Sequence, residues 1–295
     1  MTRPRQVLPE QFILINRRCT QRQFLLRPDE ETNNNILYCL GCAMQKYQME
    51  VLMLSVESNH EHIVIYDRLG NYPAFAEYFH KLLARSQNAL RGRWENFWSS
   101  EELCAVRLIS REDVIARIVY TAANPVKDRL VERVHKWPGV NGYVHLMTGR
   151  AFTAKRPRHF FRPDGPMPES VTFEMTIPPT LGPREQVLAE VRARVEAIEN
   201  ALAVEIRQGA RVVGRKRILT QSWKDSPTSV EPRRNLRPRF ACANKQDRIV
   251  VLLAYRAFLD AYQAARKRWL AQQPSVFPVG TYWLRRFAAV PVASV

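Results

Sequence analysis

The sequence predicts an α+β fold in which an antiparallel sheet carries helices on one face and a mainly helical extension follows. Three observations lead to this prediction. Strand-like apolar runs alternate with amphipathic segments in residues 1–150. A proline-rich stretch spans 151–183, and long helical patterns with many basic residues occupy 184–295. We therefore expect a first domain at 1–150, a linker at 151–183 and a basic accessory region at 184–295.

The centre of the first domain is a pair of strands joined by a short polar turn. Residues 51–56 are all apolar but one and indicate a buried strand, residues 57–59 are short enough for a hairpin turn, and 60–66 form the second strand. Side chains alternate across a strand, so His60 and His62 point to one face. Two imidazoles in that register can share a metal ion, although most such pairs are incidental.

The flanking elements complete a known order. They are a strand at 12–15 closed by polar residues, a helix at 29–47, a helix beginning near 71 and a strand at 105–109. With the central pair, the order is strand, helix, two strands, helix, strand. This order is typical of a ferredoxin-like α+β sandwich.

The next helix has a recognisable start and stop. Ser110 and Asp113 have the spacing of a capping box. We expect the helix to end at Pro125, because the residue before a proline is pushed out of the α region. Tyr120 and Asn124 are four residues apart and share one face, with Asn124 at the helix end.

The second half is less informative. Seven prolines between 157 and 183 indicate a linker or an extended wrap across the first domain. Helices are expected at 185–207 and 246–272, the latter with its apolar residues inward (Ile249, Leu252, Leu253, Leu259 and Tyr262). Basic residues concentrate at 211–217 and 233–239.

The charge of the chain predicts an anionic partner. Lys and Arg number 45 against 28 Asp and Glu, a formal net charge of +17. Nucleic acid is the leading candidate and an anionic membrane surface the second. No apolar run is long enough to span a bilayer and no signal segment is visible, so we expect a cytoplasmic, nucleoid-associated protein without a membrane partner. The five cysteines are odd in number and scattered, which does not favour a disulfide framework.

Four segments occur in a set order within residues 3–145. They are PRQVLPEQFILINRRCTQR, SNHEHIVIYD, GRWENFW and YTAANPVKDRLVERVHKWPG. They resemble, respectively, the opening strand with T-Q-R, the N-H-x-H-L motif, a W-x-G-R-F segment and the Y-x-x-x-N-P-V-[KR] region of the REP-associated tyrosine transposases. These are single-tyrosine HUH endonucleases. Four motifs in order are specific, whereas any one alone is weak.

The resemblance implies a fold, an activity and a site. The fold is that of the HUH endonucleases. The activity is metal-dependent cleavage and transfer of single-stranded or hairpin DNA through a 5′-phosphotyrosine intermediate. His60, His62 and Asn124 match the ligands of a divalent ion, Mg²⁺ or Mn²⁺, and Tyr120 matches the nucleophile. A phenol with a pKa near 10 needs help to attack at neutral pH, which a nearby cation can supply.

Nucleic-acid binding is expected from basic and aromatic residues near these motifs and in the second half. These are Arg17, Arg18, Arg22, Arg91, Arg93, Trp94, Lys127, Arg215, Lys216 and Arg217. The basic runs of the second half either hold phosphates of a hairpin stem or flanking duplex, or form a solvated surface beside a homodimer helix at 185–207.

The sequence departs from the family pattern at two positions. Glu61 stands between the histidines, where the family has an apolar residue, and Phe97 replaces a basic one. Glu61 should face away from the histidines, where either an arginine pairs with it or the strand end is exposed. Two other functions remain open. One is an inactive or domesticated HUH protein that only binds structured single strands of DNA or RNA. The other is an unrelated metal hydrolase using His60, Glu61 and His62.

Overall fold

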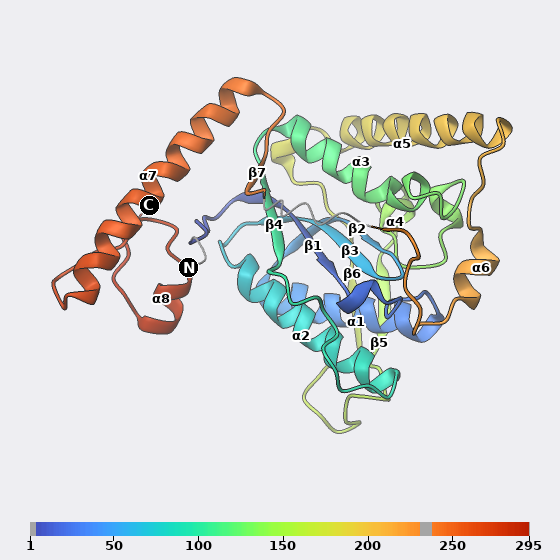
Figure 1. Cartoon of the computed structure of the whole chain (residues 1–295), viewed down its shortest axis with the longest axis horizontal. Helices are drawn as coiled ribbons and strands as arrows, with labels where there is room; N and C mark the ends of the chain where they lie inside the picture. Colours follow the sequence, from blue (N-terminus) through green and yellow to red (C-terminus); the bar gives the residue numbers. More distant parts are fainter. Residues whose placement is uncertain (1–3, 231–237, 295) are drawn as a thin grey trace.

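The computed structural model describes residues 4–230 and 238–294 and has an α+β architecture built on a five-stranded mixed sheet (Figure 1). The first seven strands and α-helices follow the expected order closely. They are β1 (Gln11–Arg18), α1 (Glu30–Tyr47), β2 (Glu50–Val56), β3 (His60–Asp67), α2 (Tyr72–Leu90), β4 (Cys104–Leu108) and α3 (Arg111–Lys127).

The sheet has the strand order β2-β3-β1-β4-β7. The first four strands pair antiparallel, and β7 (Phe240–Ala241) joins β4 in parallel. The expectation of a wholly antiparallel sheet is therefore wrong at this edge. The reason is that a short strand from the far end of the chain pairs with the free edge of β4, with Arg107 N donating to Arg239 O at 3.0 Å and Ile109 N donating to Ala241 O at 3.3 Å.

Helices cover both faces of the sheet, not one as expected (Figure 1). α1 and α2 pack side by side on one face, while α3 lies across the other against β2 and β3. Both faces of the central strands are apolar, so each needs a cover: every residue from Val51 to Val56 and from Ile63 to Tyr66 is buried.

Strand β1 is longer than the apolar run at 12–15 from which it was predicted. Its polar end was expected to close the strand, but Asn16, Arg17 and Arg18 continue the ladder opposite His62, Glu61 and His60. The histidine end of β3 therefore pairs with β1 along one edge and with β2 along the other.

N-terminal caps fix the starts of α1 and α3. Asp29 accepts a hydrogen bond from Thr32 N at 2.7 Å and begins α1. The predicted capping box of Ser110 and Asp113 begins α3. The expectation that Pro125 ends α3 is wrong, since the helix runs on to Lys127. Pro125 removes one backbone hydrogen bond, but Pro125 and Val126 are buried, and their packing offsets that loss.

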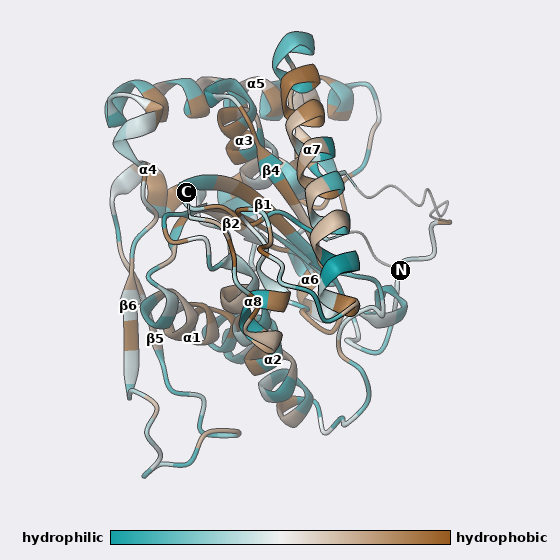
Figure 2. Cartoon of the chain, turned by 90° about the vertical axis from the view of Figure 1, so that its left-hand side faces the viewer, coloured by the Kyte–Doolittle hydropathy of each residue, from teal (hydrophilic) through white to brown (hydrophobic). Residues whose placement is uncertain are grey.

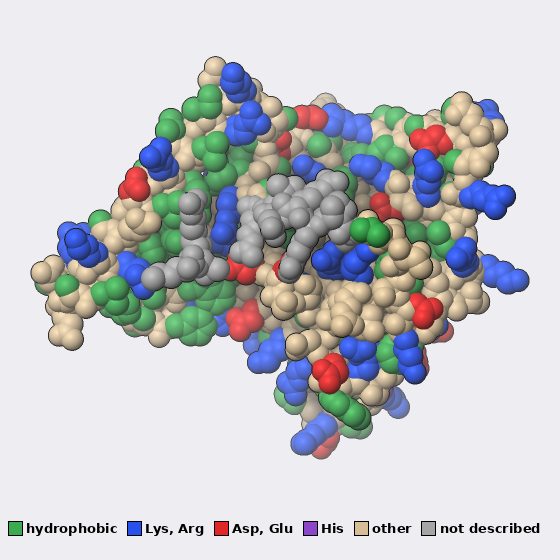
Figure 3. Space-filling model, viewed as in Figure 1, with side chains coloured by type: hydrophobic (Ala, Val, Ile, Leu, Met, Phe, Trp, Pro, Cys, Tyr) green, Lys and Arg blue, Asp and Glu red, His purple; other side chains and the backbone are tan. Residues whose placement is uncertain are grey.

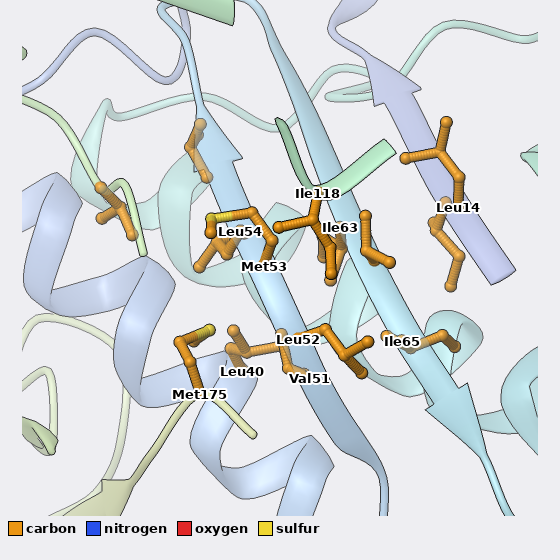
Figure 4. Packing of buried hydrophobic residues seen from close by; sticks show 14 of the residues in the cluster. Leu14, Leu40, Val51, Leu52, Met53, Leu54, Ile63, Ile65, Ile118 and Met175 are labelled. Carbon is orange, nitrogen blue, oxygen red and sulfur yellow. The ribbon is translucent and has the colours of Figure 1, made fainter. Parts of the chain in front are cut away.

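The proline-rich segment packs against α1 and the main sheet. It forms a two-stranded sheet, β5 (Phe152–Lys155) and β6 (Ser170–Phe173), that lies on α1. Tyr38 of α1 donates its hydroxyl to Pro168 O at 2.6 Å. Met175 enters the main core with Leu40 of α1 and Ile118 of α3, gathered around β2 and β3 in Figure 4.

The helix α5 (Arg184–Arg207) lies along α3 on the outside of the molecule (Figure 1). Its residues Val187, Val191 and Val195 are fully buried and belong to the same core as the sheet. The division of the chain at residues 150 and 183 stays a prediction. Short elements complete the fold: η1 (Thr20–Arg22), η2 (Val134–Lys136), α4 (Tyr143–Thr148), η3 (Pro179–Leu181), α6 (Arg215–Thr220) and α8 (Trp283–Ala288).

The long helix α7 (Lys245–Leu270) projects from the body beside the two ends of the chain (Figure 1). Ile249, Leu252 and Leu253 were expected inward but are 43%, 51% and 61% exposed. The expectation is wrong for these three residues because α7 contacts the rest through another face, on which Tyr262, also expected inward, lies with its ring centroid 5.4 Å from that of Phe277. That face carries Ala265, which packs on Phe277 and Val290. Apolar colour is visible along the outer side of α7 in Figure 2.

Of the expected basic run at 233–239, Arg233, Arg234 and Arg237 lie outside the described residues. Among the helices of the described residues, none combines the length and apolarity that crossing a bilayer requires.

The burial of α5 predicts a stability effect. Val191→Ala removes two buried methyl groups and should lower the free energy of unfolding by about 1–3 kcal/mol. Val204→Ala, on the exposed side of the same helix, is the matched control and should change it by less than about 0.5 kcal/mol. Urea unfolding followed by circular dichroism measures both, and equal effects would contradict the packing described for α5.

Candidate metal centre and nucleophile

The candidate site lies where the β2–β3 hairpin turns beneath α3. Glu57 N donates to His60 O at 2.9 Å and closes the turn. The pairing of Arg18 with His60 and of Asn16 with His62 fixes the first residues of β3 from the other side. Both histidines therefore point to the face that α3 covers, as the alternation of the strand requires.

Helix α3 carries three site residues on one face. Tyr120, Asn124 and Asp128 follow at four-residue intervals, the first two within the helix and Asp128 as its C-cap. Because α3 crosses the hairpin, Asp128 and Asn124 lie beside Glu57 and His60. Tyr120 and Asn124, four residues apart in the sequence, thus lie on the same face of α3.

Three possible metal ligands converge at this point. Potential ligand atoms of Glu57, His60 and Asp128 all lie within 4.8 Å of one another. Sequence reasoning missed Glu57 and Asp128. Two signals were available: Glu57 stands three residues before His60 at the turn, and Asp128 continues the four-residue spacing of Tyr120 and Asn124.

Asn124 is buried and faces this group through its amide nitrogen. Asn124 Nδ2 donates to Glu57 Oε1 at 2.7 Å and lies 3.3 Å from His60 Nε2. In this orientation the Asn124 side chain orients Glu57 by hydrogen bonding. To serve as an oxygen ligand, as expected from the resemblance, the amide has to turn over.

His62 lies outside the converging group and next to the tyrosine. Its ring is edge-on to Tyr120 with 5.4 Å between ring centroids, and 5.0 Å from the ring of His60. Its Nδ1 is buried and has no hydrogen-bond partner among the described residues. An imidazole nitrogen in that state is available to a ligand that the protein itself does not supply.

Burial dominates the electrostatics of the site. It lowers the pKa of His60 to about 4 and that of His62 to about 3, so both are neutral at pH 7. Burial, followed by the charge of Asp128, raises the pKa of Glu57 well above its usual range. Two neutral imidazoles beside a close pair of carboxyl groups form a donor set that a divalent cation stabilises.

Tyr120 is half-buried, and two cations lie over its ring. Lys127 Nζ is 4.5 Å and Arg117 Cζ 5.7 Å from the ring centroid. Burial and the charges of Asp128 and Glu57 raise the pKa of Tyr120, while Arg117 opposes the rise. At neutral pH the phenol is therefore protonated, and a nucleophilic role needs further cationic stabilisation.

Glu61 points away from the histidines, as expected, but its partner is not an arginine. Its carboxylate bonds to Nε2 of His80 in α2, and both side chains are buried. Trp98, next to Phe97 in the GRWENFW segment, donates Nε1 to His80 O at 2.9 Å. Glu61 cannot therefore join His60 as a metal ligand, and the hydrolase hypothesis built on His60, Glu61 and His62 does not fit this geometry.

The expected nucleic-acid contacts lie in different surroundings. Arg18 and Lys127 lie at the site, the first beside His60 and the second over Tyr120. Arg17 lies over Trp98 on the other face, at 5.3 Å from its ring centroid. Trp94 is 89% exposed.

Three other residues that were expected to contact nucleic acid form hydrogen bonds within the protein. Arg91 Nη2 donates to Asp29 and Thr32, each at 2.7 Å. Arg22 donates to Ser229, and Arg93 to Gln23 at 3.1 Å. The assignment of these residues to nucleic-acid binding stays a prediction.

A segment of the second half reaches the site, which the sequence did not indicate. Val213 N and Gly214 N donate to Arg129 O and Leu130 O, each at 2.9 Å, immediately after Asp128. Helix α6 begins at the next residue, so the exposed side chains of Arg215, Lys216 and Arg217 start beside the end of α3. Figure 3 shows basic side chains scattered over this side of the molecule.

The buried pair of Glu61 and His80 predicts a non-additive stability effect. His80→Leu leaves a buried carboxylate without its partner and should cost about 3–5 kcal/mol of unfolding free energy. Replacing both residues by Leu should cost less than His80→Leu alone, because no unpaired charge remains. Urea unfolding of the two single variants and the double variant tests this, and simple addition of the single effects would contradict it.

Several solved structures are similar to this chain. A structure of a REP-associated tyrosine transposase bound to a REP hairpin aligns with a TM-score of 0.43 and 16% identity, covering 51% of this chain and 86% of that one. A candidate transposase from Deinococcus radiodurans R1 aligns at 0.29 and 15%, covering 36% and 85%. No family model and no curated protein matches the chain.

Proposed function

We propose that this protein is a metal-dependent endonuclease and strand transferase of single-stranded or hairpin DNA, with Tyr120 as the nucleophile. The observation that carries the proposal is the position of Tyr120. It lies edge-on to His62 and on the same face of α3 as Asn124 and Asp128, which adjoin His60 and Glu57. A tyrosine placed beside a candidate cation site has the arrangement that phosphoryl transfer requires.

The fold supports the same proposal. In the first four strands the order is β2-β3-β1-β4, with α1 and α2 together on one face. We assign this unit to the ferredoxin-like arrangement of the HUH endonucleases. In this assignment β7, α3 and α5 are additions to the four-stranded unit, and α3 supplies the nucleophile.

The proposed reaction needs no nucleotide cofactor. The phenol oxygen of Tyr120 attacks the scissile phosphorus, and its proton passes to water. The P–O3′ bond breaks, and the leaving oxygen takes its electron pair and a proton to become a 3′-OH. The 5′-phosphate stays on Tyr120, so the bond energy is retained for transfer to a second DNA end.

The residues at the site fit a hard divalent ion, Mg²⁺ or Mn²⁺. Glu57, His60 and Asp128 supply two carboxylates and an imidazole, and His62 and Asn124 adjoin them. Such an ion, when bound, polarises a phosphate oxygen as a Lewis acid. Burial raises the pKa of the Glu57 carboxyl, and a bound cation would stabilise its ionised form.

Basic residues around the site supply a path for the DNA backbone. Arg18 and Lys127 flank the histidines and Tyr120, and the start of α6 extends the path with Arg215 and Lys216. Contacts to phosphates hold the strand in register without reading its sequence.

Tyr120→Phe removes only the attacking oxygen, so it should abolish the covalent protein–DNA adduct while single-stranded DNA binding stays within about twofold. The matched control is Tyr143→Phe, which removes the hydroxyl of another half-buried tyrosine away from the site. Labelled single-stranded DNA from the flanks of the gene, run on a denaturing gel with Mn²⁺, measures the adduct. Adduct in the Tyr120 variant contradicts the assignment, and binding without adduct in the wild type indicates a DNA-binding protein that does not cleave.

Glu57→Gln and Asp128→Asn should each weaken Mn²⁺ binding by about tenfold or more, because each removes an anionic oxygen ligand. Calorimetric titration of Mn²⁺ into the DNA-free protein measures this without reference to activity. Glu185→Gln, which changes an exposed carboxylate on α5, should bind as the wild type does. Unchanged Mn²⁺ affinity in both site variants would exclude the proposed carboxylate ligands.

A further inference from the structure

A second basic site lies at the opposite end of the sheet from the histidines. A small cavity of about 30 Å³, partly open to solvent, is lined by residues of the N-terminal arm, β1, β4, β7 and α7. Three of its lining residues are arginines: Arg5, Arg107 and Arg239. They come from parts of the chain more than a hundred residues apart, and Figure 1 shows where these elements meet.

This site is separate from the candidate metal centre. Gln11 lines the cavity and pairs with Asp67 at one end of β3, whereas Arg18 pairs with His60 at the other. At about 3.3 Å per residue the two ends are about 23 Å apart. Gln11, Ile13 and Arg107 also point to the α2 face of the sheet, opposite to the face of the histidines.

Acidic groups meet the positive charge of the cavity only at its margin. Among the described residues that line it, none is acidic. Glu102 lies at its margin, 4.0 Å from Arg5 Nη2, and the carboxylate of Asp67 accepts from the first amides of α2. Neither carboxylate enters the lining.

The guanidinium groups are held in place by neutral partners. Arg5 donates to Leu103 O at 2.7 Å and to Ala105 O at 3.3 Å. With its amide turned over, Gln11 places its oxygen 3.2 Å from Nη2 and Nε of Arg107. Arg239 Nη1 is buried and finds no hydrogen-bond acceptor within the described part of the chain. Buried donors without acceptors are costly, and a cluster of three cations adds mutual repulsion.

We propose that this cavity binds a phosphate group. A phosphate oxygen supplies the acceptor that Arg239 lacks and the negative charge that the three arginines share, in the geometry that guanidinium groups favour. The volume is about twice that which one water needs, so it admits some of the oxygens of a phosphate group, and the open side leaves room for the others. Tyr72 and Tyr255 also line the cavity. The source is either a free phosphate or a backbone phosphate of nucleic acid, and the inference does not depend on the proposed reaction.

The first test uses inorganic phosphate. At a tenfold excess over its dissociation constant, phosphate should raise the unfolding temperature of the wild type by about 3 °C relative to chloride of equal ionic strength. Arg239→Gln and Arg107→Gln should each weaken phosphate binding by about tenfold in a calorimetric titration. Arg192→Gln, an exposed arginine on α5, makes the same charge change and should bind as the wild type does. A wild type that responds equally to phosphate and chloride, or full binding in Arg239→Gln, overturns the proposal.

The second test identifies the source of the phosphate. If the site holds a nucleic-acid backbone, Arg239→Gln should weaken binding of a single-stranded oligonucleotide and lower its salt slope by about 0.7, and Arg192→Gln should not. If free phosphate is the ligand, the oligonucleotide affinity of Arg239→Gln matches that of Arg192→Gln while phosphate binding is lost. The cleavage assay of Tyr120 is a separate readout, so the failure of one proposal leaves the other testable.

Discussion

The pairing of β1 with β3 is the constraint on which the rest of this molecule depends. Its register sets the alternation of β3, which directs His60 and His62 to α3 and Glu61 to α2. A shift of this register by one residue would turn His60 and His62 toward α2. It would turn the carboxylate of Glu61 toward α3, the helix that carries Tyr120. The polar end of β1 is thus as important as its apolar part, because Asn16 and Arg18 hold the histidine end of the strand.

A second constraint is the balance of charge beneath α3. Burial keeps both histidines neutral, and it keeps Glu57 from ionising freely. The hydrogen bond from Asn124 compensates Glu57 in part. The end of α3 therefore combines neutral nitrogen donors with carboxyl oxygens, while Lys127 lies on the outer side near Tyr120. This combination is compatible with an ion that enters and leaves, because no arginine pairs with the carboxyl groups within the described residues.

Much of the first half could be predicted from the sequence, and the reasons are local. Alternation placed the histidines on one face, and the capping box located the start of α3. Prediction failed where distant segments meet: nothing local to Glu61 identifies His80, and nothing near Asp128 shows that residues 213–214 pair beside it.

The same limit explains the errors in the second half. The apolar face of α7 was read as inward, although helical periodicity alone cannot say which face meets the body. The strand β7 has two residues, too few for any periodic signal. The continuation of α3 past Pro125 depends on tertiary packing that outweighs a local rule.

The origin of β7 has a consequence for how the protein is made. The edge of β4 that β7 covers emerges from the ribosome about 130 residues before β7 itself. At 5–20 residues per second, that edge stays without its partner for roughly 7–26 seconds during translation. An open strand edge is a template for pairing with other chains. Synthesis of this protein therefore passes through an interval of aggregation risk that slower translation lengthens and that chaperones which shield strand edges would shorten.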